Sequence, residues 1–303
     1  MGIPESQLQT WSNQGAVITA KSTHESIRNA LTANTSPVRD KNFEPYLQGS
    51  YKNKTNIRGD SDVDLIIQLN FTFQGNTEAL SEYEKIFYER TYPNATYLWI
   101  HFRADVIKAL RAYYEVSTVS EGNKSLKVAG DSGRLPADVV VCLQYRKYQR
   151  FKSQSDQRYI EGIAFYALRE NRRVINFPKL HYSNGIDKNA EHRTNGWYKP
   201  TVRVFKNART YIIDKGVISE TLAPSYFLEC LLYNVPDEHF GSSYQKSFLS
   251  VIKWLVDSFS NDLYRNFLCQ NGQLLLFGNT AEQWTANNAA ELLKNLVDLW
   301  KNY

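Results

Sequence analysis

Two aspartates stand one residue apart at the start of an apolar run, and this stretch restricts the fold more than any other. In "GDSDVDLIIQL", Asp62 and Asp64 precede Leu65, Ile66 and Ile67. The run predicts a buried strand, and alternate residues of an extended chain point the same way. Buried carboxylates are costly unless a cation neutralises them. The pattern favours a site for a hard metal such as Mg²⁺, although a solvated turn beside a strand gives the same pattern.

A phosphate-binding turn is indicated just upstream of this acid pair. Gly49 and Ser50 follow an apolar lead-in and predict a short helical turn, and eleven residues separate Ser50 from Asp62. A hydroxyl and exposed backbone N–H groups at such a turn suit a phosphate. Because Mg²⁺ bridges the phosphates that it activates, a turn of this kind followed by paired acids is typical of phosphoryl transfer.

A third acid is expected because two-metal chemistry usually needs one more carboxylate. In "RLPADVVVCLQY", Asp138 lies 76 residues after Asp62 and again begins a β-branched run. An Asp that merely starts a strand after Pro136 is the alternative. Combined with the first motif, however, Asp138 is the expected third metal ligand.

With these residues, the chain resembles the DNA polymerase β-type nucleotidyltransferase superfamily. Within it, the sequence is similar to the E clade of the bacterial cGAS/DncV-like nucleotidyltransferases. The similarity covers essentially the whole chain, through the segments "PESQLQTWSNQGA", "QGSYKNKTNIRGDSDVDL", "LPADVVVC", "NFPKLHY", "WYKPTVRVFKNARTY", "APSYFLECLLYNVP" and "LFGNTAEQW". The resemblance implies an α+β fold, with a mixed-sheet nucleotidyltransferase core, a C-terminal helical lobe and an active site in the cleft between them.

The same resemblance implies the activity. Such enzymes make a small cyclic oligonucleotide, usually a dinucleotide, from nucleoside triphosphates, here UTP and ATP. The product serves as an alarm signal in anti-phage defence and is read by an effector protein. Two Mg²⁺ ions, or Mn²⁺ in their place, are the implied cofactors. Asp62 and Asp64 would hold the ion that grips the triphosphate, and Asp138 would join them at the second.

Further nucleotide-binding residues are carried over from the family. Lys206 and Ser225 match residues that contact the triphosphate, and Tyr226 matches one that stacks on a base. Without the resemblance, Lys206 would be a solvated helix lysine, Ser225 a residue that caps a helix and Tyr226 a core residue. In the motif "QGS", Gln48 is expected to act together with the Gly–Ser turn.

Asn176 in "RVINFPKLH" is the residue expected to select the base. In the resembled clade, Asn at this position accompanies uridine-containing products and Ser accompanies purines. The longer side chain reaches a small pyrimidine, whereas Ser leaves room for a purine. We therefore expect cyclic UMP–AMP first and cyclic di-UMP second. Alternatively, Asn176 ends a strand and satisfies local backbone groups.

The chain is expected to form two lobes, with a core over residues 1–199 and a helical lobe over residues 200–303. Apolar residues at helical spacing predict one helical stretch near the N-terminus and further helices in the rest of the chain. The polar segment between Asn176 and Pro200 is predicted to be a long loop or lid. The expected helices span residues 5–33, 98–114, 202–213, 224–234, 244–259 and 286–300. The expected strands span residues 44–47, 62–70 and 139–143, with hairpins near residues 113–130 and 159–177.

Composition is compatible with these expectations but does not lead to them. A net charge of +5 in 303 residues suits the binding of triphosphates and is also compatible with the binding of RNA. Three well-separated cysteines among apolar neighbours predict buried free thiols. No targeting segment or membrane-spanning run is recognised, so a cytoplasmic enzyme that needs neither membrane nor nucleic acid is expected. Transfer to an RNA end, a small molecule or a protein remains open, as does an inactive nucleotide-sensing module.

Overall fold

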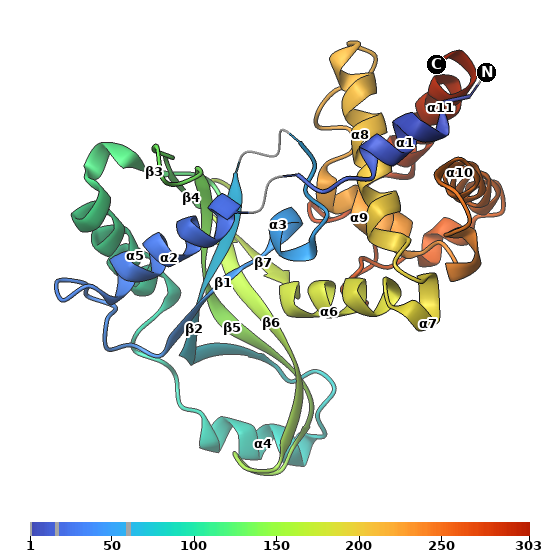
Figure 1. Ribbon diagram of the computed structural model, residues 1–303. Coiled ribbons are helices and arrows are strands. Elements are labelled where there is room, and N and C mark those ends of the chain that lie inside the picture. The colour runs from blue at the N-terminus through green and yellow to red at the C-terminus, as the bar shows by residue number, and fades with distance from the viewer. Residues whose placement is uncertain (1, 16–17, 59–61) are drawn as a thin grey trace. The chain divides into compact units, whose positions relative to one another are not determined.

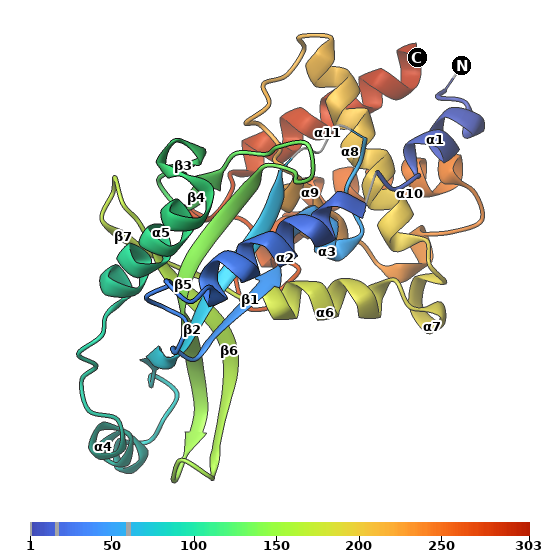
Figure 2. The same cartoon turned by 60° about the vertical axis from the view of Figure 1, so that its left-hand side comes forward.

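The protein divides into two compact units. The computed structural model describes residues 2–15, 18–58 and 62–303. One unit, here called the sheet unit, comprises residues 17–48 and 61–179, and the other, the helical unit, comprises residues 1–16, 49–60 and 180–303. The expected division at residues 199 and 200 differs from these units, because two short N-terminal segments and residues 180–199 belong to the helical unit. The elements of both units are labelled in Figure 1, and Figure 2 shows them from a second direction.

The sheet unit is built on a mixed sheet. Neighbouring strands run in the order β1-β2-β5-β4-β3, and β6 pairs with the far half of β5 and with β7. Only the β2–β5 pair among these strands of the described chain is parallel. The strands are β1 (Phe43–Leu47), β2 (Val63–Asn76), β3 (Val119–Glu121), β4 (Leu126–Val128), β5 (Ala137–Phe151), β6 (Gln157–Ala167) and β7 (Arg172–Asn176).

Apolar burial fixes the central strands as the sequence predicts. Leu65, Ile66 and Ile67 of β2 are fully buried, which explains their uninterrupted apolar run. Helices α2 (Ile18–Thr32) and α5 (Trp99–Tyr114) lie side by side against the sheet (Figures 1 and 2). The indole N–H of Trp99 donates to the carbonyl of Val141 in β5, at 2.8 Å. This bond ties α5 to β5, the strand whose second residue is Asp138.

The helical unit contains the C-terminal helices that periodicity predicts. Its core joins apolar side chains from α1 to α11 in one continuous cluster, and all three cysteines of the chain are buried free thiols, as expected. The elements are α1 (Glu5–Trp11), α3 (Gly49–Asn53), α7 (Glu191–Thr194), α8 (Tyr198–Asp214), α9 (Ser225–Tyr233), α10 (Tyr244–Ser260) and α11 (Ala286–Asn302), with 3₁₀ turns at Asp237–His239 and Leu263–Asn266.

The expected lid between Asn176 and Pro200 is wrong, because this segment is helical. Helix α6 (Pro178–Lys188) begins with a proline, which suits the first turn of a helix. His181 and Lys188 are buried on its inner face, and the Lys188 ammonium donates to the carbonyl of Val235 at 2.7 Å. Polar residues thus line a buried face here, so the apolar periodicity that usually signals a helix is missing.

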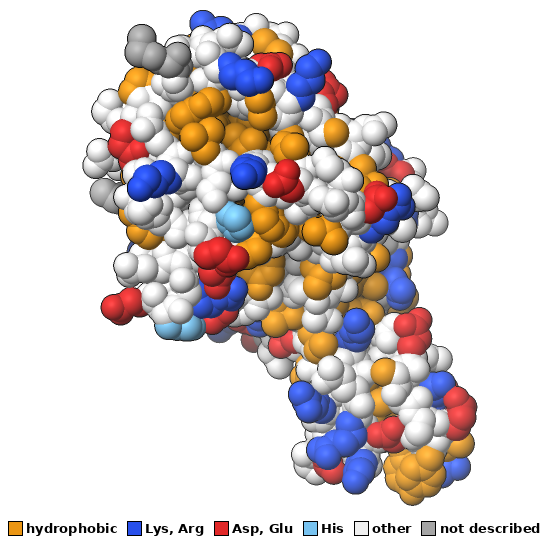
Figure 3. Space-filling model, turned by 90° about the vertical axis from the view of Figure 1, so that its right-hand side faces the viewer, with side chains coloured by type: hydrophobic (Ala, Val, Ile, Leu, Met, Phe, Trp, Pro, Cys, Tyr) orange, Lys and Arg blue, Asp and Glu red, His pale blue; other side chains and the backbone are white. Residues whose placement is uncertain are grey.

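Two other elements differ from expectation. The N-terminal stretch forms α1 and α2, two helices in different units, instead of one helical stretch over residues 5–33. Helix α4 (Glu82–Thr91) is an addition to the expected elements, although Ser81 and Glu84 form a capping box at its start. On the face shown in Figure 3, Lys and Arg side chains are interspersed with Asp and Glu. No helix within the described ranges is long and apolar enough to cross a bilayer.

Gly162 in β6 is predicted to be intolerant of a side chain. A Cβ atom there would lie 2.7 Å from the Asn176 carbonyl oxygen and 2.8 Å from the Phe177 ring. Because a strand backbone cannot move away cheaply, Gly162→Ala should lower the free energy of unfolding by about 1–3 kcal/mol. Urea unfolding measures this. Gly133→Ala is the control, since the nearest atom to its Cβ would lie 3.8 Å away, and an equal loss in both variants would contradict the prediction.

Candidate active site

The second and third predicted acids lie side by side through strand register. On the parallel strands β2 and β5, Asp64 lies directly beside Asp138. Paired residues on adjacent strands point to the same face of a sheet, so the two carboxylates share one face at one edge. Asp62 immediately precedes β2, and both Asp62 and Asp138 line a depression of about 320 Å³. An acid pair and a distant acid thus come from neighbouring strand starts.

The side chains of these acids are not gathered around one point. Within the part of the chain that the structure describes, no three His, Cys, Asp or Glu side chains are close enough to hold a metal ion. The Lys127 ammonium, from the neighbouring strand β4, lies 3.3 Å from the Asp138 carboxylate. Carboxylates on adjacent strands are still the donor set that a hard cation takes. A metal ion at Asp138 would compete with this lysine for the carboxylate charge.

A buried carboxylate organises the helical unit. Glu229 in α9 is 4% exposed and accepts hydrogen bonds from four side chains. Lys206 of α8 donates at 2.7 Å and Thr55 at 2.6 Å to one carboxylate oxygen. Asn53 at the end of α3 and His181 of α6 contact the other oxygen at 3.1 and 2.9 Å. Helices α3, α6, α8 and α9 therefore converge on one acid.

The charge of Glu229 is retained in spite of its burial. Burial alone would raise the pKa of this carboxyl, but the Lys206 ammonium and the hydrogen bonds from His181 and Lys206 outweigh that effect and lower the pKa well below its usual value. Glu229 and Lys206 thus form a buried ion pair with most of its polar atoms hydrogen-bonded, the condition under which such a pair is tolerated.

Lys206 is paired with a buried acid. Its side chain is fully buried, so it is not the solvated helix lysine of the plain alternative. Its ammonium contacts Glu229 and the carbonyl of Thr55, at 2.7 and 3.1 Å. The expected triphosphate contact would require this ammonium to leave a neutralising partner, and it stays a prediction that the geometry of the helical unit does not favour.

Ser225 and Tyr226 begin α9. The Ser225 hydroxyl accepts a bond of 3.4 Å from Arg209, and Pro224, not Ser225, is the N-cap. The Tyr226 ring is half-buried and stacks on two neighbouring rings. Its centroid is 5.0 Å from that of His181 and 5.8 Å from that of Trp284, with interplanar angles of 22° and 29°. Stacking is therefore the interaction that the surroundings of this ring already support.

The Gly–Ser turn has the expected backbone form. Gly49 begins α3 with a φ of +67°, a conformation that side chains disfavour, which explains the glycine. The Ser50 carbonyl accepts from the N–H of Thr55 at 2.9 Å. In the sheet unit, the N–H of Gln48 donates to the Asp64 carbonyl at 2.9 Å. A main-chain bond thus joins the residue before the turn to a predicted metal ligand.

Asn176 is the last residue of β7 and is half-buried. Its side-chain oxygen accepts from the N–H of Phe177 at 2.8 Å. This is the local backbone bond that the plain alternative describes. The bond does not exclude a contact with a base, because a carboxamide also carries an N–H₂ group.

Comparison with known proteins decides the family. Residues 183–301 match the cGAS/DncV-like nucleotidyltransferase C-terminal helical domain. The chain is 52% identical over 303 residues to the cyclic UMP-AMP synthase of Rhodothermus marinus, covering 100% of this chain and 99% of the relative. It is 41% identical over 306 residues to the cyclic nucleotide synthase CdnE01 of Staphylococcus haemolyticus, covering 100% of both. The chain belongs to the cGAS/DncV-like nucleotidyltransferases.

Solved structures of CdnE nucleotidyltransferases have the same fold. That of the Rhodothermus marinus CdnE c-UMP-AMP synthase with Apcpp and Upnpp matches with a TM-score of 0.88, over 99% of this chain and 97% of that one. The Elizabethkingia meningoseptica CdnE cyclic dinucleotide synthase with GTP and Apcpp matches at 0.77 and 30% identity, over 99% and 100%. The predicted family, its E clade, the α+β fold and nucleotidyltransferase activity are thereby confirmed. Enzymes of this family generally use a divalent metal ion.

One lysine of this CdnE-type chain is missed by sequence reasoning. Lys199, in the first turn of α8, is buried with 8% exposed. Burial, together with repulsion from Lys54, lowers the pKa of Lys199 to about 8. Its sequence signal is weak, since a lysine before a proline in "WYKP" looks like an ordinary solvated residue. Only its surroundings in the folded unit distinguish it.

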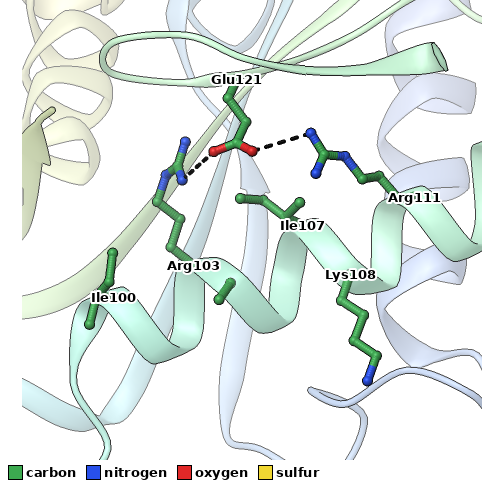
Figure 4. A pocket seen from close by; sticks show the side chains of 7 residues that line it. Ile100, Arg103, Ile107, Lys108, Arg111 and Glu121 are labelled. Atoms are coloured by element: carbon green, nitrogen blue, oxygen red, sulfur yellow. Dashed lines mark hydrogen bonds and ion pairs between the residues drawn. The ribbon is translucent and has the colours of Figure 1, made fainter. Parts of the chain in front are cut away.

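A second depression of about 510 Å³ lies along α5 in the sheet unit (Figure 4). There Glu121 of β3 lies between Arg103 and Arg111 and accepts from them at 2.8 and 3.2 Å. The hydrogen bond from Arg103 is the largest contribution that lowers the pKa of Glu121. Lys108 points away from this group. These two arginines of α5 and Glu121 hold β3 against α5. We assign the three side chains a structural role.

Breaking the buried ion pair should be costly. We expect Glu229→Gln to lower the free energy of unfolding by about 3–5 kcal/mol, because Lys206 would remain charged and buried without its partner. The double substitution Lys206→Met with Glu229→Gln should recover part of this loss, since it removes both charges. Denaturant titration measures each value. Glu291→Gln, an exposed acid of α11, is the control and should change stability by less than about 0.5 kcal/mol. A double variant less stable than Glu229→Gln would contradict the account.

Proposed function

We propose that the protein is a cyclic dinucleotide synthase whose product contains uridine, cyclic UMP–AMP first and cyclic di-UMP second. The observation that supports this most is 52% identity over the whole chain to a Rhodothermus marinus protein named cyclic UMP-AMP synthase. The adjacency of Asp64 and Asp138 on parallel strands supports the same chemistry. Relatives named dipurine and dipyrimidine synthases match at lower identity, 36% and 32%, so the base composition is the part that needs testing.

The proposed reaction is nucleotidyl transfer assisted by two divalent cations, Mg²⁺ or Mn²⁺. In the sheet unit, Asp62 and Asp64 would hold the ion bound to the triphosphate, and Asp138 would share the second ion. Bound there, the ions would lower the pKa of a ribose hydroxyl and offset the charge of the leaving pyrophosphate. The hydroxyl oxygen forms a bond to the α-phosphorus, the bond to pyrophosphate breaks, and the hydroxyl proton passes to solvent. A second such attack closes the ring.

The residues of the helical unit are proposed to hold the nucleotide. The Ser50 hydroxyl and the N–H groups of the Gly49 turn would donate to phosphate oxygens. Gln48, the residue of the sheet unit that precedes this turn in the sequence, is proposed to act with them. Tyr226 is proposed to stack on a base through its flat ring, and Ser225 would add a hydroxyl toward the phosphates. Holding both triphosphates in line contributes to catalysis because it converts encounters between substrates into a reaction within one complex. The product would signal to an effector protein of an anti-phage defence system.

The test uses the complete chain with labelled nucleoside triphosphates and Mg²⁺, without any acceptor. A phosphatase-resistant product that needs UTP is expected. Asp64→Asn should reduce its formation about 100-fold or more, because charge stabilisation by a bound metal contributes several kcal/mol. Unchanged melting of Asp64→Asn would show that the fold survives. Product only after addition of RNA, a small molecule or a protein acceptor would overturn the proposal in favour of that acceptor, and no product under any condition would favour an inactive sensor.

Base selection is predicted to depend on Asn176. If its carboxamide N–H₂ group reaches the base, Asn176→Ser should shift incorporation from UTP toward ATP or GTP, because the shorter side chain leaves room for a purine. Pairwise nucleotide mixtures with separation of the products measure the shift. Asn171→Ser, in the exposed turn before β7, is the control and should keep the wild-type products. Wild-type uridine preference in the Asn176→Ser variant would return Asn176 to its backbone role.

A further inference from the structure

Strand register places Asn176 on the same face of the sheet as two predicted metal ligands. Asp64 of β2 pairs with Asp138 of β5, and every second residue of a strand points to the same face. Further along β5, at an even spacing from Asp138, Gln144 pairs with Ile163 of β6, which in turn pairs with Asn176 of β7. Asn176 therefore shares a face with the acids, although β7 and β2 are not neighbouring strands.

The end of β7 that carries Asn176 is supported from one side only. Within the described chain, β7 pairs with β6 alone, and Asn176 forms the last pair of that ladder. The ring of Phe177, 2% exposed, packs edge-on against that of Tyr145. Strand ends at the edge of a sheet open more easily than central strands, because few contacts hold them. A side chain that selects a base from such an end needs a further anchor.

Lys179 supplies a contact of this kind. It lies in the first turn of α6 and is the last residue of the sheet unit. Its ammonium donates to Glu161 of β6 at 2.8 Å and to Glu44 of β1 at 2.7 Å. Burial alone would lower the pKa of Lys179, but the hydrogen bonds and charges of the two acids outweigh that effect and raise the pKa. A charged lysine thus ties the segment after Asn176 to two strands of the sheet.

The acids around Lys179 belong to a hydrogen-bond network that crosses the sheet. Glu161 also accepts from the carboxamide of Gln68 in β2 at 3.0 Å. Gln68, 1% exposed, accepts in turn from the Tyr46 hydroxyl at 2.8 Å, and the Lys179 ammonium lies 5.0 Å from the centroid of the Tyr46 ring. An isolated surface ion pair contributes little, whereas connected side chains hold one another in place. Lys179 is therefore joined to β1, β2 and β6.

We propose that Lys179 is a positioning residue for base selection, because its bonds to two acids hold the end of β7 and with it the carboxamide of Asn176. Lys179 acts without touching the nucleotide. Only two residues separate it from Asn176, and the ring of one of them, Pro178, fixes its φ. A displacement of Lys179 is therefore passed on to Asn176. The inference rests on the proposed function, in which Asn176 selects the base.

Amide hydrogen exchange of the complete chain, without nucleotide, measures the anchoring itself. Lys179→Gln should speed exchange of the N–H groups of β7 about 5-fold or more, because the end of the strand opens more often. Lys85→Gln is the control. It breaks a lysine–glutamate pair of 2.7 Å in α4, and Lys85 is about as exposed as Lys179, 33% against 40%. Unchanged exchange at β7 in Lys179→Gln would overturn the proposal, as would equally faster exchange in both variants, which would show general loosening of the unit.

Product composition gives a second readout, which a merely structural lysine would not change. In mixtures of UTP with ATP or GTP, Lys179→Gln should lower the ratio of uridine-containing to purine-only product about 3-fold or more. Loss of folded enzyme cancels in this ratio. Lys179→Arg keeps the charge that both acids bind and should keep most of the wild-type ratio. A wild-type ratio in Lys179→Gln, in spite of faster exchange at β7, would overturn the proposal and leave the proposed function intact.

A double variant tests whether Lys179 acts through Asn176. In an Asn176→Ser background, Lys179→Gln should leave the product ratio unchanged, because the side chain that it positions is gone. The same fold-change in both backgrounds would show independent action and overturn the proposal. Failure of the proposed function is distinguishable, since wild type would then form no uridine-containing product although exchange at β7 still rose in Lys179→Gln. That result would uphold the anchoring of β7 and remove its link to base selection.

Discussion

The helical unit depends on one buried carboxylate. Glu229 has almost no contact with water, and four donors from three other segments satisfy its two oxygens. A buried charge tolerates few alternative arrangements, because each lost donor leaves an unpaired polar group in a medium of low dielectric constant. The positions of α3, α6 and α8 relative to α9 are therefore coupled. The segment after the Gly–Ser turn and the ring of Tyr226, which stacks on His181, are fixed by the same acid.

In the sheet unit, the corresponding constraint is the parallel pairing of β2 with β5. Parallel strands that are central in a sheet are buried on both faces, so their register is set by apolar packing. That packing places Asp64 beside Asp138 although 73 residues lie between them in the sequence. A register shift of one residue would turn one carboxylate to the opposite face. The apolar residues that follow each acid thus do more than fill the core, because they align the acids.

The differences between sequence-based expectation and structure have a common cause. Residues 178–188 lack an apolar stripe, which predicts a loop, yet they form α6 with His181 and Lys188 buried through polar contacts. Read from the residues alone, Lys206 would be a solvated helix lysine, and it is buried against Glu229. In each case a polar residue is buried with a partner that is distant in sequence. Periodicity detects apolar burial only, so satisfied polar burial is invisible to it.

The sequence by itself determined the family, the α+β class, the central strands, most helices and the three candidate metal ligands. Those features follow from local order: an apolar run makes a strand, a glycine permits the positive φ at Gly49, and acids at strand starts mark an edge of the sheet. The tertiary structure alone decided the electrostatic state of the lysines. Lys199 and Lys206 lie seven residues apart on one helix, and both look alike in the sequence. Their difference arises because the free energy of a buried charge depends on the partners that folding brings to it.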